Sequence, residues 1–225
     1  MSFDYHSGVS LDVENTGSPG EEKTIRADVA TGDGSVTISG DTYELLQFHF
    51  HAPAEHLING VEAPMELHMV HRDAPGNLLV VGRLIEPCSV ATVICTTSLD
   101  GIFSALPASG AHSPSAVTFD LGSLLPADLG SFQYDGSLTT APYTEGVKWN
   151  VLVEPLFMAG ANITAFEALF DGPHGNTREL QALNGRVILT DVSGFVGSVP
   201  EPETYVLMLA GLAALRVAAR HRKAV

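Results

Sequence analysis

The chain has 225 residues, of which 45% are hydrophobic and 16% charged, so it can bury the core of one domain of ordinary size and is not disordered. Its 26 acidic residues outnumber 11 basic ones, and the formal net charge of −15 at pH 7 argues against nucleic acid as a partner. The two cysteines, Cys88 and Cys95, could pair if the protein is exported, but one pair at this spacing does not decide the compartment.

Most of the chain predicts strands separated by turns. Alternating or continuous apolar runs predict strands at residues 35–40, 43–51, 78–85 and 147–153. Helix signals are confined to residues 99–106 and 162–172. We therefore expect a mainly β protein of the α+β class with a few short helices.

Five of the nine histidines lie in one short segment, LLQFHFHAPAEHLINGVEAPMELHMVH. Because side chains alternate between the faces of a strand, His49 and His51 project to the same face as Gln47, and the intervening phenylalanines face the core. The same alternation in MELHMVH places His68 on one face with Glu66. If the two segments are neighbouring strands, these three imidazoles converge.

Converging histidines are a candidate zinc site. Three neutral imidazoles fill three corners of a tetrahedron and leave the fourth open, which is typical of catalytic sites. Gln47 and Glu66 are suited to accept the second N–H of a ligand. A His-x-His pair alone is more often exposed to solvent, or buried with its hydrogen bonds made in the core, than part of a metal site. The third histidine, preceded by a glutamate two residues earlier, favours the metal site. The remaining histidines are interpreted as hydrogen-bonding structural residues at His56 and His71, and as surface residues at His6, His112, His174 and His221.

Residues 199–225 differ from the rest of the chain. A Pro-Glu-Pro stretch at 200–202 marks a linker, an apolar run from Tyr205 to Leu215 follows, and four of the eleven basic residues end the chain. As a helix the run covers about 17 Å, short of the roughly 30 Å hydrocarbon core, so a membrane span would be marginal and temporary. The alternative is an amphipathic or docked helix. The order of features resembles the PEP-CTERM sorting signal of Gram-negative bacteria, which an exosortase recognises.

The motifs QFHFHAPAEH, ELHMVH and GSLTTAP, followed by Trp149 and by NTRELQALNGR, resemble the α-class carbonic anhydrases of bacterial type over about residues 3–192. The resemblance implies a large, mostly antiparallel central sheet, zinc as the cofactor, and carbon dioxide or bicarbonate as the substrate. It implies zinc ligands at His49, His51 and His68, hydrogen-bond partners for them at Gln47, Glu66 and Asn176, an orienting pair at Thr139 and Glu55, and a substrate pocket lined by Val70, Val80, Leu138, Thr140 and Trp149.

The chain also departs from that family. We expect a carbonic anhydrase domain at 1–198 that lacks the family's N-terminal segment, followed by the sorting tail at 199–225. No histidine stands near 14–22, where the family's proton shuttle is expected, so buffer or solvent should accept the proton. The opening MSFDYHSG is no signal peptide although the tail presupposes export. We therefore expect DNA upstream of Met1 to encode both a signal peptide and the missing segment.

The sequence thus predicts a zinc-dependent carbonate dehydratase in the periplasm or on the surface of a Gram-negative bacterium. Its tail would anchor it to the membrane at least transiently and be processed by an exosortase-type enzyme. Two alternatives stay open. One is a weak or inactive carbonic-anhydrase-like module that binds a surface or matrix, which the loss of a zinc histidine would favour. The other is a zinc esterase, which relative rates on carbon dioxide and on an ester would distinguish.

Overall fold

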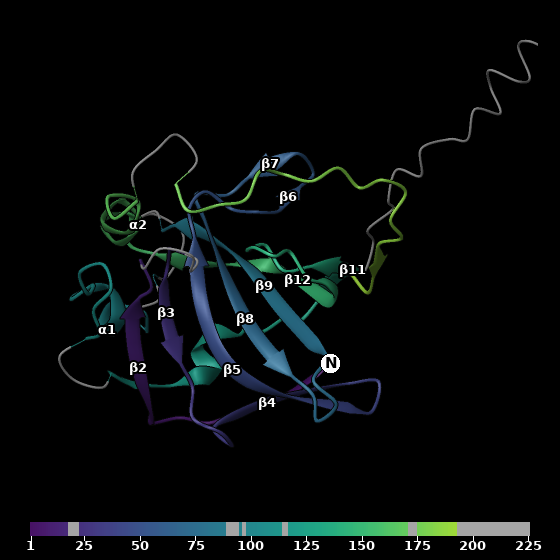
Figure 1. Ribbon diagram of the computed structural model, residues 1–225, viewed down its shortest axis with the longest axis horizontal. Coiled ribbons are helices and arrows are strands. Elements are labelled where there is room, and N and C mark those ends of the chain that lie inside the picture. Colours follow the sequence, from purple (N-terminus) through teal and green to yellow (C-terminus); the bar gives the residue numbers. More distant parts are fainter. Residues whose placement is uncertain (18–22, 89–94, 96–97, 114–116, 171–174, 193–225) are drawn as a thin grey trace, which may run out of the picture. The chain divides into compact units, whose positions relative to one another are not determined.

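Figure 1 shows the computed structural model, which describes residues 1–17, 23–88, 95, 98–113, 117–170 and 175–192. The elements in chain order are β1 (Ser2–Tyr5), β2 (Val9–Asn15), β3 (Ile25–Asp28), β4 (Gly34–Ile38), β5 (Asp41–His51), β6 (Leu57–Ile58), β7 (Val61–Glu62), β8 (Met65–Arg72), β9 (Leu78–Pro87), α1 (Asp100–Phe103), β10 (Val117–Phe119), the 3-10 helix η1 (Leu121–Leu124), β11 (Ser131–Ser137), β12 (Glu145–Met158), α2 (Gly160–Glu167) and β13 (Leu189–Thr190).

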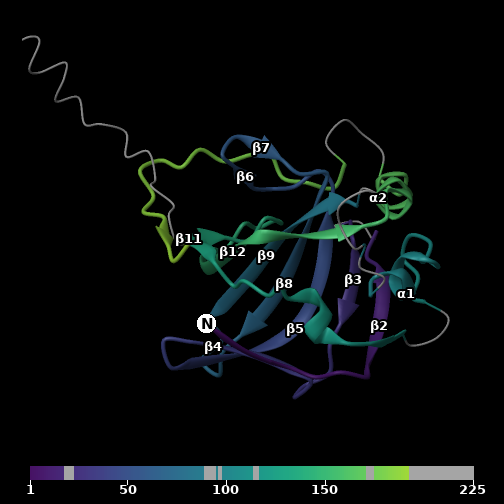
Figure 2. The same ribbon diagram turned by 180° about the vertical axis from the view of Figure 1, so that it is seen from behind.

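One large sheet dominates the described residues. Eleven strands form it, in the order β10-β2-β3-β5-β8-β9-β12-β11-β13, with β4 pairing both β1 and β5, while β6 and β7 pair separately. Every pair is antiparallel except β9 with β12, which is parallel. The views from both sides show β5, β8 and β9 side by side (Figures 1 and 2). The predicted mainly β fold with a mostly antiparallel central sheet is confirmed.

The central strands are buried on both faces. On one face Phe48 and Phe50 of β5 pack into the main core, which also takes in the buried residues of α1 and α2. On the other face a smaller apolar cluster gathers Val80 of β9 and Trp149 of β12. Because both faces of β9 are buried, its sequence from Leu78 to Ile85 is apolar apart from Arg83, whereas β2 alternates between buried and more exposed residues.

Both predicted helices are present but shorter. The helix predicted at 162–172 spans Gly160–Glu167 instead, and α1 covers only Asp100–Phe103 of the predicted 99–106. After Glu167 the amides of Leu169 and Phe170 bond to the third residue back rather than the fourth, and this tightening ends the α-helix. Within the described ranges no helix is long and apolar enough to cross a membrane. The helix predicted in the tail lies outside these ranges.

The two cysteines are paired. Cys88 directly follows β9, donates its amide N–H to the carbonyl of Met158 at 2.9 Å, and forms a disulfide with Cys95. The amide hydrogen bond to Met158 places Cys88 next to the end of β12. The pairing that the sequence left open is therefore present in the structure.

A buried histidine joins β1 to the central strands. His71 is fully buried, its Nδ1–H donates to the carbonyl of Leu79 at 3.3 Å, and its Nε2 accepts from the hydroxyl of Tyr5 at 2.6 Å. Burial lowers the pKa of His71 to about 4, against the opposing effect of the backbone carbonyls of Leu79 and Met69. His71 is thus a neutral structural residue, as its position in the sequence indicated.

This lowered pKa predicts a loss of stability in mild acid. Between pH 6.5 and 4 the unfolded chain protonates His71 while the folded chain does not, so the free energy of unfolding should fall as pH falls through this window, by about 3 kcal/mol in total. Urea unfolding at pH 7 and 4.5 measures it. His71→Phe should be less stable at pH 7 but lose less stability on acidification, and the exposed control His6→Asn should follow the wild type. Parallel pH profiles for wild type and His71→Phe would contradict the prediction.

Candidate metal centre

Three histidines meet on the face of the sheet opposite the main core. β5 and β8 are antiparallel neighbours, in register such that His49 lies opposite His68 and His51 opposite Glu66. The ring centroids of the three imidazoles are 5.0 Å (49 to 51), 5.3 Å (49 to 68) and 4.5 Å (51 to 68) apart. All three side chains are buried, and one nitrogen of each lies within 4.8 Å of the other two. The structure therefore brings together the three residues that strand alternation predicted.

Each of these rings donates one N–H to an acceptor of the protein. The acceptors for His49 Nδ1, His51 Nδ1 and His68 Nε2 are, in turn, the side-chain oxygen of Gln47 at 2.8 Å, the carbonyl of Asn176 at 3.2 Å and the carboxylate of Glu66 at 3.0 Å. A neutral imidazole that donates from one nitrogen presents a lone pair on the other. The three rings together therefore offer three nitrogen ligands in fixed orientations.

Burial favours the neutral form that metals bind. It lowers the pKa of His49 well below the ordinary value, with the neighbouring His51, His68 and Arg26 acting in the same direction and Glu66 opposing. Burial also lowers the pKa of His68, again against the opposing Glu66. A buried, uncharged imidazole is ready to accept a cation without first losing a proton.

The buried carboxylate of Glu66 bonds to His68 and to the loop after β5. Glu66 accepts the backbone N–H groups of Glu55 at 2.9 Å and His56 at 3.0 Å, and the ring N–H groups of His56 at 2.6 Å and His68 at 3.0 Å. Burial raises the pKa of Glu66, but His56 and His68 outweigh it and hold that pKa well below the ordinary value. The second ring nitrogen of His56 bonds to the hydroxyl of Tyr134 at 2.6 Å.

His56 was expected to be a structural hydrogen-bonding residue, and the structure places it in this network. Burial lowers the pKa of His56, but the charge and hydrogen bond of Glu66 outweigh it and raise that pKa overall. His56, Glu66 and His68 lie close enough together to hold a metal as well. Their facing atoms already bond one another, so the set of His49, His51 and His68 is the better candidate.

Two glycines make room for this arrangement. Gly82 of β9 lies opposite His68, and a Cβ there would come within 2.8 Å of Glu66 Oε1. Gly175 has a φ of +55°, and a Cβ there would overlap the carbonyl oxygen of Ala52. Glycine at these positions lets β9 approach the carboxylate and lets the segment starting at residue 175 approach the end of β5.

Asn176 joins that segment to the end of β5, the strand that carries His49 and His51. Its side-chain oxygen accepts the backbone N–H of Ala52 at 2.9 Å, and its side-chain nitrogen donates to the carbonyls of Lys23 and Phe50, each at 2.9 Å. The carbonyl of Asn176 is thereby held where His51 can donate to it. Residue type alone gives no signal for this role, because the acceptor is a backbone atom 125 residues away in the chain.

Of the expected orienting pair, Glu55 lies beside the histidines. Glu55 is nearly buried, and its Oε1 accepts the backbone N–H of Arg178 at 2.7 Å. Its Oε2 lies 3.9 Å from His68 Nδ1 and has no hydrogen-bond partner among the described residues. Thr139 follows β11, and in this part of the chain no hydrogen bond joins it to Glu55.

Four of the five expected pocket residues lie on the same face as the histidines. Val70, Val80 and Trp149 form one buried cluster with Leu138 packed against it, and Thr140 is partly buried in the segment after β11. The centroid of the Trp149 ring lies 4.8 Å from that of His68. An apolar wall therefore adjoins the candidate metal ligands.

Comparison with protein families identifies two parts of the chain. Residues 1–192 match the model of the eukaryotic-type carbonic anhydrases. Residues 198–223 match the PEP-CTERM protein-sorting motif. The first match covers all the strands and helices described above.

Individual relatives agree with the family match. A carbonic anhydrase of Klebsiella pneumoniae is 37% identical over 168 residues, which are 74% of this chain and 65% of that protein, so the chain spans somewhat less than two thirds of the relative. An α-carbonic anhydrase of Photobacterium profundum superposes with a TM-score of 0.72 at 33% identity, covering 84% of this chain and 80% of that one. A Chlamydomonas reinhardtii carbonic anhydrase in complex with acetazolamide gives 0.74 at 34% identity, covering 85% and 81%. The chain therefore belongs to the eukaryotic-type carbonic anhydrase family.

Proposed function

We propose that the protein is a zinc enzyme that converts carbon dioxide and water reversibly into bicarbonate and a proton. The observation that carries the proposal is the group of three buried imidazoles, each held through one N–H by Gln47, Asn176 or Glu66. Family membership and the named relatives support the same reaction.

The donor set fits zinc. Three neutral imidazoles supply three nitrogen ligands and leave a fourth position open, and their outer hydrogen bonds fix which nitrogen is offered: Nε2 of His49 and His51, and Nδ1 of His68. When bound, zinc lowers the pKa of a coordinated water to about 7, for which carbonic anhydrase is itself the reference case, and so supplies hydroxide at neutral pH.

The protein's own residues would hold and orient the substrate. The apolar wall of Val70, Val80 and Trp149 would seat carbon dioxide beside the histidines and keep competing water away. The hydroxyl of Thr139 would donate a hydrogen bond to Glu55 Oε2, the oxygen without another partner among the described residues, and so could only accept a hydrogen bond from the attacking nucleophile. Since residues 14–22 contain no histidine, buffer or solvent would take up the released proton.

The zinc assignment predicts the behaviour of a ligand variant. We expect about one zinc per chain and carbon dioxide hydration in the zinc-loaded protein, and His68→Ala should lose both, because two remaining imidazoles bind zinc weakly. Metal analysis and stopped-flow hydration assays measure the two quantities. The exposed control His112→Ala should retain both. Full zinc occupancy in His68→Ala would show that the ligand set is wrong, and zinc without hydration in the wild type would favour a binding module.

The orienting role predicts a separation of metal binding from activity. Thr139→Ala should keep its zinc yet hydrate carbon dioxide about a hundredfold more slowly, the scale of losing one positioned group in the transition state. Thr144→Ala, an exposed threonine of the same loop, serves as the matched control and should behave like the wild type. Equal activity in Thr139→Ala would remove Thr139 and Glu55 from the mechanism.

We propose further that residues 199–225 direct export and sorting in a Gram-negative bacterium and anchor the protein transiently in the membrane. The match to the sorting motif and the order of Pro-Glu-Pro, apolar run and basic end support this role. An exosortase-type enzyme would then remove the tail, and the intact mass of protein from envelope fractions should end near Pro202. A joint Pro200→Ala and Pro202→Ala variant should keep its tail. A wild-type mass that includes Val225 in these fractions would contradict the processing.

A further inference from the structure

We propose that Arg178 and Tyr143 form a clamp that positions the threonine loop, defined as residues 137–144, against Glu55. The inference deepens the proposed function and rests on it in one respect. The proposed function gives Thr139, which lies in this loop, its role beside Glu55. In this role Arg178 and Tyr143 are positioning residues that need not touch substrate.

The first observation is the backbone of Tyr143. Its φ is +58°, in the left-handed region that a bulky residue rarely adopts, and the residue is 44% exposed. Burial in the core therefore does not account for an aromatic residue at this strained position, where glycine or asparagine would fit more easily. Such an outlier persists only where the surroundings hold it, and it points to a role for the side chain.

The second observation is the partner of that side chain. The guanidinium carbon of Arg178 lies 4.1 Å from the centroid of the Tyr143 ring, within the range of a cation–π interaction. The left-handed backbone of Tyr143 thus coincides with a ring that stacks on a cation from a distant part of the chain. The contact joins the far end of the threonine loop to the segment that begins at residue 175.

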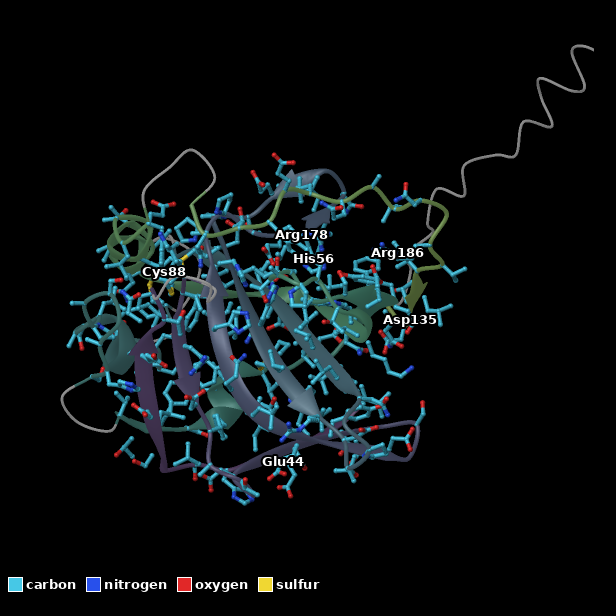
Figure 3. The ribbon with its side chains drawn as sticks, in the orientation of Figure 1. Glu44, His56, Cys88, Asp135, Arg178 and Arg186 are labelled. Carbon is cyan, nitrogen blue, oxygen red and sulfur yellow. A yellow bond between two sulfur atoms is a disulfide. The ribbon has the colours of Figure 1, made fainter. Side chains whose placement is uncertain are left out.

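Arg178 also bonds to the near end of the loop and to Glu55. Its Nη1 donates to Ser137 Oγ at 3.1 Å and to the carbonyl of Leu138 at 3.4 Å, while its backbone N–H donates to Glu55 Oε1 at 2.7 Å. One residue therefore contacts both ends of the loop and the carboxylate that the loop must face. Figure 3 shows Arg178 and His56 at the same end of the central strands, with Glu44 at the opposite end.

The base of the clamp is itself fixed. Asn176 lies two residues before Arg178. Its side chain makes three hydrogen bonds, two to the backbone at the end of β5 and one to the carbonyl of Lys23. Two hydrogen bonds lie within the loop, from Leu138 N–H to the Thr144 carbonyl and from Tyr143 N–H to the Thr140 carbonyl. They close a turn but do not orient the loop relative to Glu55. The near end of the loop is also held by the bond of Trp149 Nε1 to the Ser137 carbonyl at 3.0 Å, by the pairing of Ser137 with Glu145 and by the packing of Leu138 on the apolar cluster. Arg178 differs from these contacts because it bonds both to the loop and to Glu55.

The clamp is tested by replacing the ring while following the loop directly. We expect the backbone amides of residues 138 and 143 to exchange roughly two- to fivefold faster in zinc-loaded Tyr143→Leu than in the zinc-loaded wild type. Leucine keeps much of the bulk of the side chain but has no aromatic face for the cation. Tyr143→Phe should restore nearly wild-type protection, because the ring face and not the hydroxyl binds the cation. The kcat for hydration should fall by the same factor in Tyr143→Leu and recover in Tyr143→Phe.

Tyr143→Gly separates positioning from stability. It relieves the left-handed backbone and should keep or raise the melting temperature, yet accelerate loop exchange at least as much as Tyr143→Leu. Leu180→Ala is the control, because Leu180 is exposed and lies in the same segment as Arg178. It should change neither the melting temperature nor the loop exchange. Wild-type protection in Tyr143→Leu, or equal loss in Tyr143→Phe and Tyr143→Leu, would overturn the clamp. If the variants show the expected differences in exchange but the zinc-loaded wild type does not hydrate carbon dioxide, the proposed function is overturned and the clamp stands.

Discussion

The antiparallel register between β5 and β8 is the constraint on which the rest of the site depends. It sets His49 opposite His68 and keeps the phenylalanines of β5 in the main core. Because strand side chains alternate with a period of two, a slip of one residue would turn the imidazoles into the core and expose the aromatic rings on the other face. The hydrophobic effect that packs the core therefore also helps to hold the candidate ligands in place, together with their hydrogen bonds to Gln47, Asn176 and Glu66.

Glu66 extends this constraint into electrostatics. A buried carboxylate is unfavourable unless its charge is compensated, and Glu66 has four N–H donors, from two backbone and two ring nitrogens. One donor belongs to His68, and the other three come from the loop that contains Glu55 and His56. The carboxylate thus orients a ligand, orders the loop after β5 and links both to Tyr134. We expect a change at any of these partners to disturb the hydrogen bond that orients His68.

The strand pattern alone predicted much of the site, since alternation in two neighbouring segments was enough to bring His49, His51 and His68 to one face. Thr139 and Glu55 came only from family resemblance, because a threonine after a strand and a glutamate in a loop have no distinguishing periodicity. The contributions of Asn176 and Arg178 depend on backbone atoms and on contacts more than 120 residues apart in the chain. Helix ends were also misplaced, because the tightening after Glu167 arises from local hydrogen bonding that an apolar pattern does not record.

The close approach of β9 to the carboxylate links two positions in the history of this chain. Glu66 fits because Gly82 has no side chain, and the oxygen would lie 2.8 Å from any Cβ added there. The two positions therefore cannot vary independently: a larger residue at 82 becomes acceptable only after the acid at 66 has been shortened to aspartate or lost. A lineage that keeps the longer carboxylate as the hydrogen-bond partner of His68 is confined to glycine on the neighbouring strand, although that glycine is not itself one of the candidate metal ligands.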